Sequence, residues 1–151
     1  MKKILIITSL LIGLLTTISA QKLPVLNQKV LDFCIRNKGK QVDRGECWDL
    51  AKHALDSAQA KWKFPYTYGK AYDYKKQTIL AGDLIQFENV TFASTYESIM
   101  MPQHTAIVAE VKPNNVIVIA HQNFQGNLTV QFTEIDLKNL KKGKLFFYRP
   151  E

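Results

Sequence analysis

The feature of this sequence that most constrains the fold is a change in hydrophobic spacing near Gly82. Before this glycine, apolar residues recur at intervals of three or four, which is the spacing of amphipathic helices. After it, they alternate with polar residues or run together in short segments, which is typical of β-strands. Helices followed by hairpin-connected strands predict an α+β fold, in which N-terminal helices pack on a small, mostly antiparallel β-sheet.

The expected elements follow from this spacing. The first helix begins after Pro24 and ends before Gly39, because glycine commonly stops a helix. The second runs from about Glu46 to Ala60, with small and apolar residues along one stripe. The expected strands are residues 83–87, 104–111, 116–123, 128–132 and 145–148, with a helical turn at 136–140, a loop at 62–77 and a flap-like connection at 89–102.

The N-terminus has the pattern of a secretory signal. Lys2 and Lys3 precede an apolar run from Ile4 to Leu15, and small residues follow up to Ala20. The run is shorter than the roughly 20 apolar residues of a membrane-spanning helix. We therefore expect a cleaved signal peptide at residues 1–20 and a single domain at residues 21–151, which is exported to the periplasm or secreted, has no membrane span and is a monomer.

Composition excludes several classes of protein and of partner. A chain of 151 residues with 46% hydrophobic residues fits one compact domain and excludes a collagenous or disordered protein. The net charge is +7, but the lysines are scattered and form no nucleic-acid motif, so no nucleic-acid partner is expected. Metal-ligand spacings and phosphate-binding glycine loops are absent from the sequence, so neither a metal nor a cofactor is expected.

The two cysteines differ in their surroundings. Cys47 begins the second expected helix, where the positive end of the helix dipole and unpaired N–H groups stabilise a thiolate. A nearby imidazole would activate it further, as in thiol hydrolases. Cys34 occupies an apolar position of the first helix. We favour a free thiol at Cys47; the alternative is a disulfide with Cys34, which export would favour and which would leave no nucleophile.

The hairpin around Pro113 decides whether the histidines meet. If its loop has two or four residues, Lys112 pairs with Ile117, and His104 shares a face of the sheet with His121 and Asn123. A three-residue loop would put His104 on the other face. A catalytic constellation of these residues therefore depends on the register of this hairpin.

Three sequence blocks resemble the NlpC/P60–CHAP superfamily of cysteine peptidases. They are residues 45–50 (GECWDL), 82–87 (GDLIQF) and 104–108 (HTAIV), in the order that the superfamily has them. The chain also resembles, more weakly, the cysteine-proteinase-fold domain of fungal adaptors of the myosin tail region-interacting type. The resemblance implies a papain-like fold, in which the cysteine opens a helix packed on a small antiparallel sheet.

The resemblance also implies roles for particular residues. Cys47 would be the nucleophile, and His104 the general base that later acts as the acid. His121 or Asn123 would orient the imidazole, and Gln41 would contribute to the oxyanion hole.

Two acidic residues are interpreted separately from these roles. Glu46 is an unfavourable neighbour for a nucleophilic cysteine, because its carboxylate opposes ionisation of the Cys47 thiol. We expect Asp83 to satisfy backbone groups at the entrance of its strand rather than to take part in the reaction.

Two functions follow from the sequence. The first is an exported cysteine-dependent amide hydrolase, a peptidase or amidase, for which the resemblance implies peptides of the cell wall (peptidoglycan) as substrate. The alternative is a non-catalytic binding or interaction module that retains the cysteine-proteinase fold. A thiol within hydrogen-bond reach of the His104 ring would favour catalysis, whereas a cleft filled by residues 96–101 would favour binding.

Overall fold

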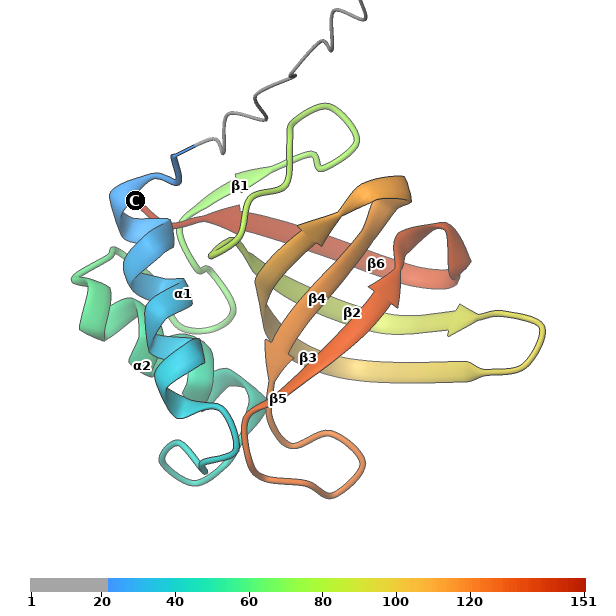
Figure 1. The fold of residues 1–151 in the computed structure, drawn as a ribbon, viewed down its shortest axis with the longest axis horizontal. Coiled ribbons are helices and arrows are strands. Elements are labelled where there is room, and N and C mark those ends of the chain that lie inside the picture. The colour runs from blue at the N-terminus through green and yellow to red at the C-terminus, as the bar shows by residue number, and fades with distance from the viewer. Residues whose placement is uncertain (1–21) are drawn as a thin grey trace, which may run out of the picture.

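The computed structural model describes residues 22–151, so the signal peptide expected at residues 1–20 lies outside the described part (Figure 1). Two helices come first, α1 (Val25–Asn37) and α2 (Cys47–Ala58), close to the predicted bounds. They pack against each other and against one face of a sheet, as Figure 1 shows. Among residues 22–151, no helix has the length and apolar character needed to span a membrane.

The sheet has six strands, and every neighbouring pair is antiparallel. The strands are β1 (Lys70–Tyr72), β2 (Leu84–Ala93), β3 (Ser98–Lys112), β4 (Val116–His121), β5 (Gln131–Asp136) and β6 (Leu140–Arg149). Their order across the sheet is β1-β6-β2-β3-β4-β5. Two helices on an antiparallel sheet confirm the predicted α+β, papain-like fold.

Residues 89–102 do not form the predicted flap. Strands β2 and β3 continue through this segment as a long hairpin, whose turn is closed by a 2.9 Å bond from Ser94 N to Glu97 O. The hairpin projects beyond the rest of the sheet, and Tyr96 at its tip is 94% exposed (Figure 1). The segment therefore extends away from the helices and does not fill a cleft beside Cys47. The alternation of apolar residues at Val90 and Phe92 was the signal for a longer strand.

Other boundaries differ by smaller amounts. The predicted loop at 62–77 contains the short strand β1, and the strand predicted at 128–132 lies at Gln131–Asp136. The helical turn predicted at 136–140 is a 3₁₀ turn, Leu137–Asn139. Strand β6 begins five residues before the predicted position, at a segment rich in lysine.

In the β3–β4 hairpin, His104 and His121 share one face of the sheet as predicted, although the strand register differs from the predicted one. Its connection is a three-residue 3₁₀ turn, Pro113–Asn115, so Lys112 pairs with Val116 rather than with Ile117. With that turn and an unbroken register, His104 would lie on the face of the sheet opposite to His121. An irregularity between Val108 and Glu110 shifts the register by one residue, and Ile107 then pairs with Ala120. The two shifts compensate, and His104 and His121 share one face.

The core is divided between the two faces of the sheet. On the helix side, Leu84, Ile107 and Ala120 pack with α1 and α2. On the opposite side, the neighbouring strand positions form a second apolar cluster, which includes Ile85, Phe87, Ala106, Val108 and Ile119. Alternation along β3 places Thr105 on the helix side and His104 on the opposite side.

The buried carboxylate of Asp83 joins these layers. Its Oδ2 accepts from Tyr72 (2.6 Å), from the backbone N–H of Leu80 (2.8 Å) and from Arg149 Nη2 (2.9 Å). Its Oδ1 accepts from Asn27 Nδ2 (2.8 Å) and from Arg149 Nε (3.0 Å). Asp83 thus satisfies a backbone N–H at the strand entrance, as predicted, and also connects α1, β1 and β6.

We predict that Asp83→Ala destabilises the domain strongly. The substitution leaves Arg149 and Asn27 without their carboxylate partner, and breaking a buried ion pair of this kind typically costs about 3–5 kcal/mol. Urea unfolding followed by circular dichroism measures the free energy of unfolding. Asp136→Asn is the matched control, because Asp136 only caps the short turn through Lys138 N. Equal stability of the two variants would contradict the central role of Asp83.

Candidate active site

Cys47 is the first residue of α2, and a compact loop holds this helix start in place. The carboxylate of Asp49, in the first turn, accepts the backbone N–H of Glu46 (3.2 Å) and pairs with Arg44 Nη2 (2.6 Å). An acidic side chain in the first turn satisfies unpaired N–H groups and complements the helix dipole. The guanidinium of Arg44 also stacks over Trp48 at 5.0 Å from the ring centroid.

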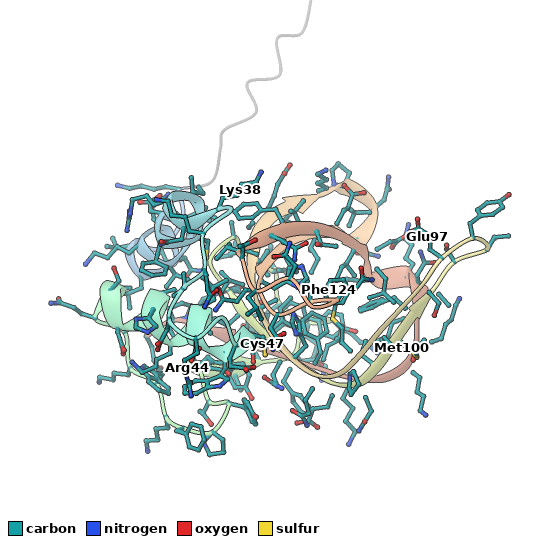
Figure 2. The ribbon with its side chains drawn as sticks, turned by 90° about the horizontal axis from the view of Figure 1, so that it is seen from below. Lys38, Arg44, Cys47, Glu97, Met100 and Phe124 are labelled. Atoms are coloured by element: carbon teal, nitrogen blue, oxygen red, sulfur yellow. The ribbon has the colours of Figure 1, made fainter. Side chains whose placement is uncertain are left out.

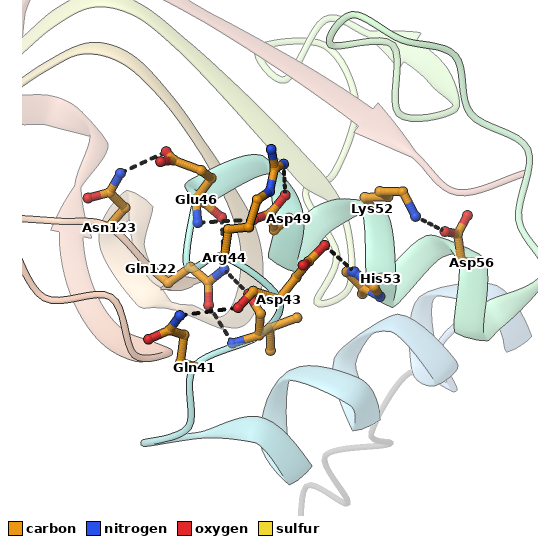
Figure 3. A network of polar contacts seen from close by, with 11 residues as sticks. Gln41, Asp43, Arg44, Glu46, Asp49, Lys52, His53, Asp56, Gln122 and Asn123 are labelled. Carbon is orange, nitrogen blue, oxygen red and sulfur yellow. Dashed lines mark hydrogen bonds and ion pairs between the residues drawn. The ribbon is translucent and has the colours of Figure 1, made fainter.

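Gln122 and Asn123 bind this loop from the opposite side (Figure 3). The buried Gln122 donates to the carbonyls of Val42 (3.0 Å) and Glu46 (2.8 Å) and accepts the Val42 N–H (3.2 Å). Asn123 Nδ2 donates to Glu46 Oε2 (2.8 Å). Asn123, predicted as an orienter of His104, thus contacts the helix entrance. The structural role of Gln122 was missed, and only its place between the two candidate orienters hinted at it.

Gln41 lies on the surface of the same loop. Its Nε2 donates to the carbonyl of Asp43 at 3.1 Å, and its side chain is exposed (Figure 3). The amide proposed for the oxyanion hole is therefore occupied by a neighbouring backbone group in this structure. The carboxylate of Asp43 binds His53 Nε2 at 3.0 Å.

His104 and His121 form a buried pair. His104 Nε2 lies 2.9 Å from His121 Nδ1, and His121 Nε2 lies 2.8 Å from Thr133 Oγ1. The two rings are perpendicular, and Phe124 packs against both. The predicted orienting role thus has a geometric counterpart in His121, which holds one ring nitrogen of His104. Among residues 22–151, no hydrogen bond to His104 Nδ1 occurs.

Burial makes both imidazoles weak bases. It lowers the pKa of His104 from 6.5 to about 4. Burial, together with repulsion from His104, lowers the pKa of His121 from 6.5 to about 3. Desolvation penalises the charged form of a histidine, and this site contains no carboxylate that would compensate it. The pair is therefore neutral at physiological pH.

The thiol of Cys47 forms no disulfide and is half-buried, and its hydrogen-bond partner is Thr105. Burial is the main cause that raises its pKa above the ordinary value, and the charge of Glu46 adds to the rise. Hydrogen bonds from the backbone and side chain of Thr105 and from the backbone of Trp48 lower it in part. His104 is not a hydrogen-bond partner of the thiol, although it precedes Thr105 in the chain. Cys34 is also free and lies in the apolar core.

A chain of polar groups continues from Thr105 across the helix-side face. The Thr105 hydroxyl donates to Gln86 Oε1 (2.7 Å) and lies 3.0 Å from the Tyr68 hydroxyl. Gln86 Nε2 then donates to Gln103 Oε1 (3.0 Å). The Thr105 hydroxyl has a single proton, which it donates either to Gln86 or to the Cys47 sulfur, so it can support a thiolate only after turning away from Gln86.

A groove of about 420 Å³ lies beside His104. One wall is the β3 segment from Ser98 to His104, and the other is the turn of residues 123–125. Figure 2 shows Cys47 and Phe124 near the middle of the molecule, with Met100 and Glu97 farther out along the hairpin. In the described part of the chain, no group of three or more His, Cys, Asp or Glu side chains is arranged to hold a metal.

We predict that Glu46→Gln lowers the pKa of Cys47. The substitution removes a negative charge that opposes thiolate formation and keeps an oxygen that can accept from Asn123. We expect about a two-fold faster alkylation by iodoacetamide at neutral pH, since an exposed charge acts through water. Glu97→Gln, at the hairpin tip, is the matched control. A slower reaction of the Glu46 variant would contradict this prediction.

The buried histidine pair predicts acid-sensitive folding. Both folded-state pKa values lie below 6.5, so the unfolded chain takes up protons first as the pH falls from about 6.5 to about 4. Stability then decreases by up to about 1.4 kcal/mol per pH unit for each histidine. Urea unfolding between pH 7 and pH 4 measures this slope.

The double variant His104→Asn, His121→Asn should flatten the slope. Ile119→Val, on the same face, lowers stability without removing a titrating group and should retain the slope. An unchanged slope in the double variant would contradict a buried, neutral pair.

Comparison with known protein families gives a match over most of the chain. Residues 25–151 match the family described as the AIM3/BBC1 cysteine proteinase-fold domain. Altered inheritance of mitochondria protein 3 of Debaryomyces hansenii is 31% identical over 134 residues, which cover 74% of this chain. The chain spans only 14% of the length of that relative.

Two solved structures share the fold. The crystal structure of Ly7917 superposes with a TM-score of 0.53 at 16% identity, over 82% of this chain and 62% of that chain. The crystal structure of Ly7917 with the hydrolyzing product of MDP gives a TM-score of 0.51 at 18% identity, over the same 82% and 62%. At these identities the similarity shows the fold alone.

Proposed function

We propose that this chain, which belongs to the AIM3/BBC1 family of cysteine-proteinase-fold domains, hydrolyses amide bonds through Cys47, His104 and His121. The observation that carries the proposal is the ordered contact of His104 Nε2 with His121 Nδ1, and of His121 Nε2 with Thr133. This contact holds one nitrogen of the His104 ring and leaves Nδ1 as the nitrogen for the thiol proton. A nucleophile, a base and a third group that orients the base are the components of a thiol hydrolase.

The productive tautomer follows from the hydrogen bonds. When His104 Nε2–H donates to His121 Nδ1, and His121 Nε2–H donates to Thr133, the lone pair of His104 Nδ1 is free. The Cys47 thiol gives up its hydrogen bond with Thr105, forms one with His104 Nδ1 and transfers its proton to this nitrogen. The thiolate attacks the amide carbon, and the imidazolium then returns the proton to the leaving amine. Water, deprotonated by His104, hydrolyses the resulting thioester and restores the thiol.

The oxyanion of the tetrahedral intermediate needs donors near the start of α2. The backbone N–H of Cys47 lies at the helix N-terminus, where such groups are unpaired. In our proposal Gln41 supplies the second donor, for which its amide has to leave the carbonyl of Asp43. Asn123 supports the site indirectly, because it holds Glu46 at the entrance of the helix.

We also propose a substrate class and a location for this hydrolase. The signal-like N-terminus supports export, and an exported amide hydrolase of this fold would meet the peptides of the cell wall. The structure of Ly7917 with the hydrolyzing product of MDP, which shares the fold, is consistent with a substrate of this class.

A specific observation favours a second function, that of a non-catalytic interaction module. Burial raises the pKa of Cys47 and lowers that of His104, so both groups are neutral at rest. An active thiolate–imidazolium pair has the opposite charges. A domain that retained the fold but only bound a partner would need no such pair.

Activity assays of site variants separate the two functions. Purified peptidoglycan is incubated with the wild-type protein, and released fragments are analysed by chromatography and mass spectrometry. Cys47→Ala should reduce release by about a thousand-fold or more, as loss of a nucleophile does in related chemistry. His121→Ala should reduce it by about a hundred-fold, which is the typical contribution of a positioned proton-transfer group.

His53→Gln is the matched control, because His53 is an exposed histidine outside the pair. Its rate should stay close to that of the wild-type protein. Equal release by the wild-type protein and Cys47→Ala would rule out the hydrolase and leave the interaction module.

A further inference from the structure

The hydrogen-bond chain through the two histidines ends at Thr133 of β5. His104 Nε2 lies 2.9 Å from His121 Nδ1, and His121 Nε2 lies 2.8 Å from Thr133 Oγ1. Thr133 pairs with Ile119 of β4, and residues two positions apart on a strand share a face, so Thr133 lies on the same face as His121. Within residues 22–151, the Thr133 hydroxyl makes no other hydrogen bond. The three side chains therefore form one short polar chain.

This polar chain can run in either of two directions. A hydroxyl both donates and accepts, and a neutral imidazole has one N–H and one bare nitrogen. Because burial lowers the pKa of both histidines, each ring is neutral at physiological pH. If Thr133 accepts from His121 Nε2–H, then His121 Nδ1 accepts from His104 Nε2–H, and His104 Nδ1 is bare. If Thr133 donates instead, both rings carry their proton on Nδ1.

The direction of the chain decides whether His104 can act as a base. A bare Nδ1 accepts a proton from a thiol, whereas an Nδ1–H does not. The two rings are held by Phe124, which packs against both, so their nitrogens keep their positions. The hydroxyl of Thr133 can rotate its proton toward His121 or away from it. Thr133 is therefore the member of the chain that can select the direction.

Three features favour the direction in which Thr133 accepts. Both rings then carry their proton on Nε2, which is the tautomer that a neutral histidine prefers in water. The Thr133 proton can then face solvent, because this side chain is half-buried, whereas both histidines are buried. In the opposite direction, the buried Nδ1–H of His104 has no acceptor among residues 22–151. Buried donors without a partner are rarer in proteins than buried acceptors without one.

We propose that Thr133 is a positioning residue, which accepts from His121 Nε2–H and thereby keeps His104 Nδ1 bare. His121 transmits this choice, because its own Nδ1 must then accept from His104 Nε2–H. The consequence for hydrolysis rests on the proposed function, whereas the tautomers of the two rings do not. The site thus extends across β4 to a threonine whose hydrogen bond is to His121 rather than to His104.

NMR spectroscopy of the histidine rings measures the tautomers in the full wild-type chain. Two-bond proton–nitrogen correlation spectra distinguish protonated from bare ring nitrogens at neutral pH. In both His104 and His121, Nδ1 should be bare and Nε2 should carry the proton. Protonation of Nδ1 in either ring would overturn the inference. This measurement needs no variant, so it does not depend on whether a variant folds.

Two substitutions of Thr133 provide a matched pair. Thr133→Ser keeps the hydroxyl and should keep the wild-type tautomers. Thr133→Val has nearly the same shape but cannot accept, so a proton on His121 Nε2 would have no partner. The proton should move to Nδ1 of both rings, and the population with a bare His104 Nδ1 should fall by about ten-fold. Thr91→Val, at a half-buried position of β2, is the control and should leave both rings unchanged.

Release of fragments from purified peptidoglycan separates the inference from the proposed function. Thr133→Val should release fragments about ten-fold more slowly than the wild-type protein, and Thr133→Ser should stay within about two-fold. The expected tautomers in a wild-type protein that releases no fragments would support the role of Thr133 and reject the hydrolase. Unchanged tautomers in Thr133→Val, together with release by the wild-type protein, would reject the inference and leave the hydrolase standing.

Discussion

The structure depends on the buried carboxylate of Asp83, because this one group fixes α1 relative to the sheet. It binds α1 through Asn27, β1 through Tyr72 and β6 through Arg149, and the next residue begins β2. The approach of α1 is so close that a Cβ on Gly82 would lie 2.1 Å from the Asn27 carbonyl oxygen. Gly82 also has a φ of +82°, which favours glycine. This glycine and carboxylate set the distance between α1 and the sheet that carries the histidines, and α2, which carries the thiol, packs against α1.

The sequence allowed the helices and the class of fold to be predicted, because both depend on local hydrophobic spacing. The register of the β3–β4 hairpin could not be obtained in the same way. Its three-residue turn would have separated His104 from His121, and the irregularity after Val108 brings them back to one face. Such irregularities depend on how strands twist and pack. Hence the predicted meeting of the histidines is found in the structure, although the predicted register is wrong.

The same limit applies to the site. The positions of Cys47 at a helix start and of the histidines on strands could be predicted, because they follow from element boundaries. The partners of individual polar side chains could not, because they join segments about eighty residues apart: Gln122 binds Val42 across 80 positions. Gln41 and Asn123 have the residue types of an oxyanion donor and an orienter, yet each hydrogen-bonds the loop before α2. Only the relative placement of these segments decides which partner each amide meets.

The electrostatics of the site oppose ionisation of the thiol in the resting domain. At the start of α2, the helix dipole favours the thiolate, but burial outweighs it and raises the pKa of Cys47. Burial also lowers the pKa of His104, so transfer of the thiol proton to this ring is uphill in the resting domain. Thr105 hydrogen-bonds the thiol and donates its own proton to Gln86, which in turn donates to Gln103 of β3. Ionisation of the thiol therefore requires the hydroxyl of Thr105 to turn away from Gln86.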